Sequence, residues 1–99
     1  MFEKAKQLYE LQKQARALQK ELRNTEIEAR SPDGKITVVF NGEMHLKSIS
    51  IDDSRLHDRK SLERDLEKTI AEAISRTQAY AAEKTKKIMG DLGLKIPGM

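Results

Sequence analysis

Basic side chains recur at a fixed interval near the start of the chain. Lys6, Lys13 and Lys20 are spaced seven residues apart, and Arg16 and Arg23 repeat beside them at the same interval. Seven residues make nearly two turns of an α-helix and rise about 10 Å, so in a helix these cations form one stripe. Such a stripe suits a polyanion. The alternative is a solvated helix face whose lysines serve solubility.

A second basic cluster lies near the far end of the chain. Lys84, Lys86 and Lys87 are candidates for contacts to the same polyanion, or for cations favoured by the dipole at a helix C-terminus. The whole chain has 19 Lys and Arg against 16 Asp and Glu, a net charge of +3. Residues 1–24 hold six basic and three acidic side chains, so the excess of positive charge lies in the first segment.

The apolar residues predict the elements that position these cations. In residues 2–24 leucine and alanine recur at intervals of three and four, which predicts a helix with one narrow apolar seam. Residues 25–30, 35–41 and 43–51 alternate as strands do, and residues 60–89 carry the apolar face of a long helix capped by Asp58 or Ser61. Residues 90–99 form a tail with Gly and Pro. We therefore expect an α+β protomer of order α-β-β-β-α in a single domain over 1–99.

The turns join the strands into an antiparallel meander of order 1-2-3. Ser31-Pro32-Asp33-Gly34 is typical of a tight turn. Asn41-Gly42 predicts a two-residue type I′ hairpin turn. The second helix is longer than a sheet of short strands can cover, so one end of it should project.

The apolar alternation changes phase within the hairpin. Ile36 and Val38 have even numbers, whereas Ile49 and Ile51 have odd numbers. A β-bulge near residues 47–48 explains this by turning the later residues onto the same face. The alternative is a sheet buried on both faces, by a helix and by a second protomer, and Val39 favours it. This second interpretation predicts a homodimer interface that includes Val39, Ile49 and Ile51.

Other chemistry is not indicated. His45 and His57 are far apart in the sequence, no cysteine is present, and Asp52-Asp53 lack the alternating oxygen ligands of a calcium loop. No nucleophile elbow or phosphate-binding glycine loop occurs. We therefore expect no enzyme activity, catalytic residue, metal or cofactor, and no small-molecule substrate. No signal peptide or membrane span is indicated, so a cytoplasmic protein is expected.

Three features in this order resemble one bacterial family. Asn41-Gly42 is followed by Ile49, Ile51 and Asp52, a short link leads into Leu62-Glu63-x-Asp65-Leu66, and Met89 precedes Leu94, Pro97 and Gly98. Together they resemble the YbaB/EbfC family of nucleoid-associated proteins over nearly the whole chain. Many members open with a Gly- and Met-rich leader, whereas here the first predicted helix begins almost at Met1.

The resemblance implies a tight homodimer whose helices project like the arms of tweezers. It also implies binding of double-stranded DNA in the nucleoid with weak or variable sequence preference. The DNA-contact residues come from the heptad spacing in the first segment and from the basic cluster near the far end, and not from the family; they are Lys6, Lys13, Arg16, Lys20, Arg23, Lys84, Lys86 and Lys87. An alternative function is a prefoldin-like chaperone or a coiled-coil interaction module without nucleic acid. Sequence preference, RNA binding and the biological role of binding stay open.

Overall fold

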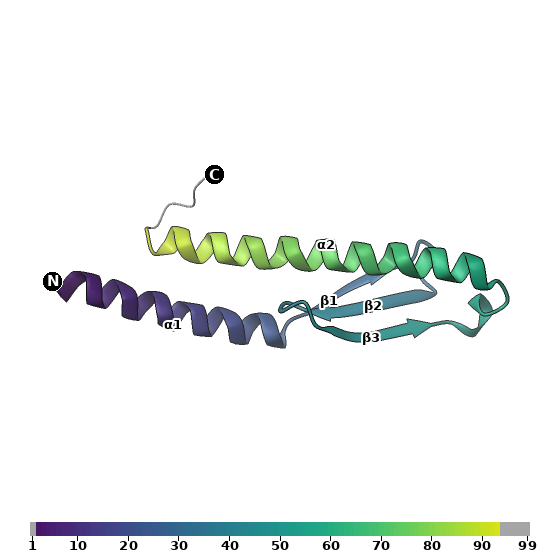
Figure 1. Cartoon of the computed structure of the whole chain (residues 1–99), viewed down its shortest axis with the longest axis horizontal. Helices are drawn as coiled ribbons and strands as arrows, with labels where there is room; N and C mark the ends of the chain where they lie inside the picture. The colour runs from purple at the N-terminus through teal and green to yellow at the C-terminus, as the bar shows by residue number, and fades with distance from the viewer. Residues whose placement is uncertain (1, 94–99) are drawn as a thin grey trace.

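The computed structural model describes residues 2–93 and has the order α-β-β-β-α (Figure 1). Its elements are α1 (Phe2–Asn24), β1 (Glu26–Arg30), β2 (Ile36–Asn41), β3 (Leu46–Ile51), the short 3₁₀ helix η1 (Asp53–Arg55) and α2 (Arg59–Asp91). The third strand begins at Leu46 and not at residue 43 as predicted. The tail predicted over 90–99 begins inside α2, and its residues 94–99, with Leu94, Pro97 and Gly98, lie outside the described residues.

The three strands form an antiparallel sheet in the predicted order β1-β2-β3. Ile36, Val38 and Phe40 of β2 are buried, and Ala29 of β1 and Ala73 of α2 join them in the core. The apolar face of α2 packs mainly on β1 and β2 through Leu62, Leu66, Ile70 and Ile74. A sheet with one face under a helix explains the alternation of apolar and polar residues along β1 and β2.

A bulge in β3 explains the change of phase in the hairpin. Val39 pairs with Ser48 whereas Phe40 pairs with Leu46, so Lys47 is an extra residue. After the bulge Ile49 pairs with Val38, and paired residues place their side chains on the same face. Of the two interpretations that the sequence left open, the bulge therefore accounts for Ile49 and Ile51, which lie on the face that α2 partly covers.

The turn between β2 and β3 differs from the predicted two-residue type I′ turn. Asn41 N–H donates to the carbonyl of His45 at 2.9 Å, so the loop holds three residues. Its third residue, Met44, has a φ of 69°, the left-handed conformation that follows a type I turn in three-residue hairpins. The buried Asn41 side chain accepts hydrogen bonds from the N–H groups of Glu43 at 3.0 Å and His45 at 3.1 Å.

The same turn fixes the end of α1. Gly42 N–H donates to the Leu22 carbonyl at 2.7 Å, and Asn41 Nδ2 donates to the Arg23 carbonyl at 3.3 Å. Carbonyls at a helix C-terminus have no partner within the helix, so these donors supply one. The direction in which α1 leaves the sheet is thereby set by a hairpin about 20 residues later in the chain.

The protein is elongated because α1 and the second half of α2 extend beyond the sheet. α2 has 33 residues, which makes it about 50 Å long. It covers the sheet with its first half and continues alongside α1 with its second, so that the whole measures 67 × 26 × 15 Å (Figure 1). The sequence predicted that one end of the second helix projects beyond the sheet, and the second half of α2 is that end.

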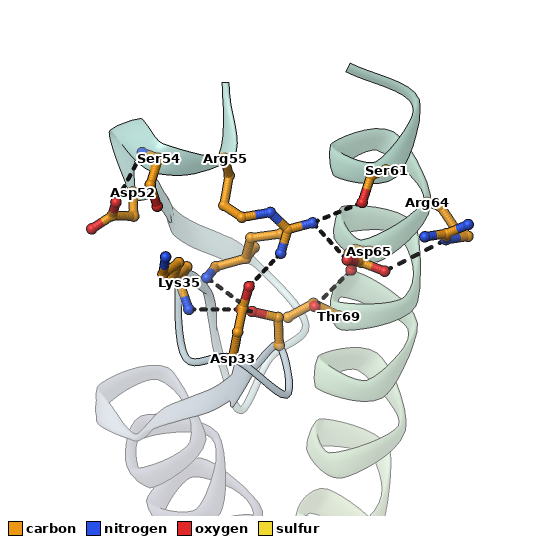
Figure 2. A network of polar contacts seen from close by, with 11 residues as sticks. Asp33, Lys35, Asp52, Ser54, Arg55, Ser61, Arg64, Asp65 and Thr69 are labelled. Carbon is orange, nitrogen blue, oxygen red and sulfur yellow. Dashed lines mark hydrogen bonds and ion pairs between the residues drawn. The ribbon is translucent and has the colours of Figure 1, made fainter. Parts of the chain in front are cut away.

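Arg55 joins the N-terminal end of α2 to the β1–β2 turn (Figure 2). Its guanidinium donates to Asp33 Oδ2 at 2.7 Å, to Asp65 Oδ2 at 2.6 Å and to Ser61 Oγ at 3.2 Å. Hydrogen bonds from Ser31 and from Lys35 N–H, with the Arg55 contact added, lower the pKa of Asp33 to about 2. The hydrogen bond from Arg55 is the main cause that lowers the pKa of Asp65.

We predict that this network makes stability sensitive to acid. Carboxylates with lowered pKa values stabilise the fold above their ordinary pKa of 3.8, and this contribution is lost as the pH falls from there towards about 2, where Asp33 protonates. Arg55→Ala should lower the melting temperature at pH 7 and weaken its pH dependence, chiefly through Asp65. Thermal unfolding followed by circular dichroism between pH 7 and pH 2 measures both effects.

The matched control is Arg59→Ala. Arg59 lies 3.5 Å from Glu63 and both side chains are exposed, so this pair should contribute little. Equal melting temperatures for the Arg55 and Arg59 variants across the pH range would contradict the assignment.

Candidate nucleic-acid interface

The predicted basic stripe lies on the outer face of α1. The helix turns Leu11, Leu18 and Leu22 inward, where they are partly buried. Lys6, Lys13 and Lys20 fall on the opposite side, because residues two and five positions away from the seam lie across a helix of 3.6 residues per turn. All three are exposed, and so is Arg16 beside them. We name Lys6, Lys13, Arg16 and Lys20 the α1 stripe.

The α1 stripe is available for an external partner. Across residues 2–93, none of its four cations takes part in an intramolecular ion pair. Glu10 on a neighbouring row reduces the local positive charge without pairing. Cations that form no internal pair keep their full charge for anions in solution, and this distinguishes the stripe from Arg23 and Lys84.

Arg23 lies at the end of the same helix but is engaged. Its Nε donates to Glu43 Oε1 at 3.1 Å, and this contact lowers the pKa of Glu43. The pair links the last turn of α1 to the β2–β3 turn, next to the hydrogen bonds of Asn41 and Gly42. The first role of Arg23 is therefore to hold α1 on the sheet.

Lys84 also has a structural partner. Its Nζ lies 3.1 Å from Glu21 Oε1 on α1 and 5.6 Å from the centre of the Tyr80 ring. The hydrogen bond to Glu21 raises the pKa of Lys84. Lys84 thus bridges the two helices where they run side by side, and its charge is engaged by Glu21.

Lys86 and Lys87 are exposed near the end of α2. The helix continues to Asp91, and its last turn contains no basic residue. Since the dipole effect falls off within the last turn, it gives little reason for lysines at these positions. The dipole interpretation is therefore weakened, and both lysines stay candidates for anion contacts.

Sequence reasoning missed a second basic row on α2. Lys60, Arg64 and Lys68 recur every four residues and are exposed, on the side of α2 opposite the apolar residues that cover the sheet. Spacing by four is the signal that could have revealed them. Arg64 lies 3.7 Å from Asp65, whose shorter contact is with Arg55, so this pairing is weak. The row lies at the sheet end of the molecule, away from the α1 stripe.

The structure offers little for other kinds of site. Within residues 2–93, no three side chains among His, Cys, Asp and Glu are gathered in a way that could hold a metal ion. In the same part of the chain, neither long helix has the apolar stretch needed to cross a membrane.

Comparison with known proteins places the chain among described relatives. Residues 1–93 match the YbaB/EbfC DNA-binding family. A nucleoid-associated protein of Rhodospirillum centenum is 37% identical over 93% of this chain and 86% of its own length. One from Synechocystis sp. is 38% identical over 99% of this chain and 82% of its own length. The crystal structure of an uncharacterized Helicobacter pylori protein has the same fold, with a TM-score of 0.77 and 22% identity over 83% of this chain and 88% of that one.

Proposed function

Because this chain belongs to the YbaB/EbfC DNA-binding family, we propose that it is a nucleoid-associated protein whose α1 stripe binds the phosphates of duplex DNA. The observation that carries the proposal is the row of four exposed cations on α1, none of which is paired within residues 2–93. Family membership also argues against the prefoldin-like alternative. Lys86 and Lys87 are further contacts in this proposal, whereas Arg23 and Lys84 support α1.

Binding of this kind positions the protein on DNA without reading its sequence. Each lysine that reaches a phosphate releases condensed counterions, so affinity depends on salt. Contacts to phosphate carry no direct information about the bases. The long lysine side chains of an exposed helix row can follow the DNA backbone, and weak sequence preference is the expected consequence.

A salt titration tests the proposal on the unmodified protein. Affinity for several unrelated duplexes should fall steeply between about 50 and 200 mM salt, with a slope of about −0.9 for each phosphate neutralised. The slopes should agree between sequences of equal length, as measured by fluorescence anisotropy. No binding to any duplex at low salt would contradict the function itself.

We also propose that the protein acts as a homodimer joined through β3. This strand is at the edge of the sheet, and α2 leaves its side of the apolar face open. Leu46 is 52% exposed and Ile49 is 41% exposed there. An unpaired edge strand with apolar side chains is typical of a surface covered by another chain, and a two-fold axis can pair it with its own copy.

The three residues predicted to form the dimer interface do not lie together on the sheet. Ile49 lies on the open part of the face, and Ile51 is partly buried against the core beside Ile36. Val39 lies on the other face of the sheet, opposite Glu28 and Ser48. The proposed interface keeps Ile49, adds Leu46 and leaves Val39 out.

Ile49→Asp should convert the dimer into a folded monomer. The side chain is already half-exposed in the protomer, so a carboxylate there is tolerated by the fold but not by a covered apolar interface. Val39→Lys is the matched control, because it places a cation opposite Glu28 on the other face. Solution mass from light scattering, with circular dichroism as a check of folding, separates the variants. A monomer from Val39→Lys and a dimer from Ile49→Asp would assign the interface to the opposite face.

A further inference from the structure

One aromatic ring lies exposed on the outer side of α1. Tyr9 is 67% exposed, although burying a ring of this size is normally favourable. On a helix its neighbours are three, four and seven positions away, which here include Lys6, Lys13 and Arg16. The exposed ring is thus surrounded by the cations of the α1 stripe.

A shallow hollow lies beside this ring. Ala5, Lys6, Tyr9 and Glu10 line it, and its volume is about 440 Å³. The methyl group of Ala5 and the carbon chain of Lys6 give it apolar walls next to the ring. A flat group can therefore lie against the Tyr9 ring and exchange water for apolar contact.

The charges around Tyr9 favour a nucleic acid over a second copy of the chain. A symmetric contact between two copies places each surface against itself, so the α1 stripe of one protomer would face the α1 stripe of the other. Like charges at such short range oppose that contact. A nucleic acid offers phosphates to the cations and a nucleobase to the ring, which is the combination found in proteins that bind single strands.

From this we infer that Tyr9 stacks on a nucleobase that has left the regular base stack. The inference rests on the proposed function and names the DNA that the α1 stripe prefers, namely DNA with unpaired or partly unstacked bases. In a regular duplex the base faces are covered, and the phosphate contacts act alone.

The tyrosine emission of the protein gives a direct test. The chain has two tyrosines and no tryptophan, so in Tyr80→Phe the remaining signal comes from Tyr9. Tyr80 OH donates a long hydrogen bond, of 3.5 Å, to Thr25 Oγ1, and the substitution to phenylalanine keeps the ring in place between the helices. Saturating single-stranded DNA should quench Tyr9 emission strongly, and a perfect duplex should quench it much less. Equal quenching by both, or none, would overturn the inference.

Affinity measurements supply the second arm. Tyr9→Ala should weaken binding to single-stranded or mismatched DNA about tenfold and leave binding to perfect duplex nearly unchanged, since one stacked base contributes about that factor. Tyr9→Phe keeps the ring and should bind both like the unmodified protein. Equal loss on both kinds of DNA, or emission that changes with protein concentration in the absence of DNA, would overturn the stacking and leave the phosphate contacts standing. If the unmodified protein binds no DNA at all, this result would instead contradict the proposed function.

Discussion

Replacing Lys6, Lys13 and Lys20 together by glutamate is expected to weaken DNA binding about 10²- to 10³-fold at about 0.1 M salt for each protomer that contacts the DNA. Each phosphate contact contributes about 0.9 to the slope of log affinity against log salt, which corresponds to nearly tenfold in affinity at that concentration. Losing three contacts should also flatten the slope by about three for each protomer. Anisotropy titrations at several salt concentrations measure both quantities.

A matched variant separates the position of the charges from their total. Lys35, Lys60 and Lys68 are exposed at the sheet end of the molecule, outside the proposed β3 interface, and within residues 2–93 none of them forms an ion pair. Their replacement by glutamate changes the net charge of the chain by the same amount. If the α1 stripe is the contact surface, this control should lose far less affinity.

Two results would contradict the assignment. Equal losses in both triple variants would show that net charge alone governs binding. A larger loss in the control would move the interface to the row on α2. Both sets of lysines are exposed, so neither triple variant should unfold the protein, and circular dichroism verifies this.

Local patterns in the sequence were sufficient to predict where the helices and strands occur. The intervals of three and four among the leucines of residues 2–24 predicted α1, and alternation predicted β1 and β2, because burial of one face is what these elements share. The alternation in β3 could be interpreted in two ways. Only the register with β2 showed that Lys47 is a bulge, since register depends on a neighbouring strand.

Contacts between residues far apart in the sequence could not be predicted from such patterns. Heptad spacing placed Lys6, Lys13 and Lys20 on one exposed face. The predicted cluster near the far end of the chain, however, included Lys84, which binds Glu21 more than 60 residues earlier in the chain. The partner of a long charged side chain is decided by how the helices meet in space. For this reason a stripe on one helix could be predicted, whereas the division between structural and free cations could not.

At Asn41-Gly42 the sequence correctly predicted a turn, but the structure shows a different reason for the glycine. The pair predicted a turn in which glycine supplies a left-handed φ, and Met44 has that conformation instead. Gly42 is required for another reason. A Cβ at this position would lie 2.8 Å from both Cα and the carbonyl oxygen of Leu22, and backbone atoms cannot move aside as a flexible side chain can.

Gly42→Ala should therefore destabilise the protein by about 1–3 kcal/mol, the usual cost of forcing extra atoms into a packed contact. For a domain of this size the melting temperature should fall by about 10 °C. The added methyl group pushes Leu22 away and weakens the 2.7 Å hydrogen bond from Gly42 N–H to its carbonyl. Thermal and urea unfolding followed by circular dichroism measure the loss.

Gly90→Ala is the control with the opposite sign. A Cβ at Gly90 meets no atom within 4 Å, and the residue is helical, so alanine should stabilise the protein by up to about 1 kcal/mol. Equal changes in the two variants would mean that the contact between the hairpin and α1 is not tight. DNA binding by the Gly42→Ala variant gives a further result. If the variant is less stable, as expected, but its α1 stripe still binds DNA at low temperature, then the hairpin stabilises α1 without forming part of the DNA-binding surface. A loss of DNA affinity at temperatures where the variant is still folded would mean that the direction of α1, fixed by the backbone of Leu22 and Gly42, also positions the stripe on DNA.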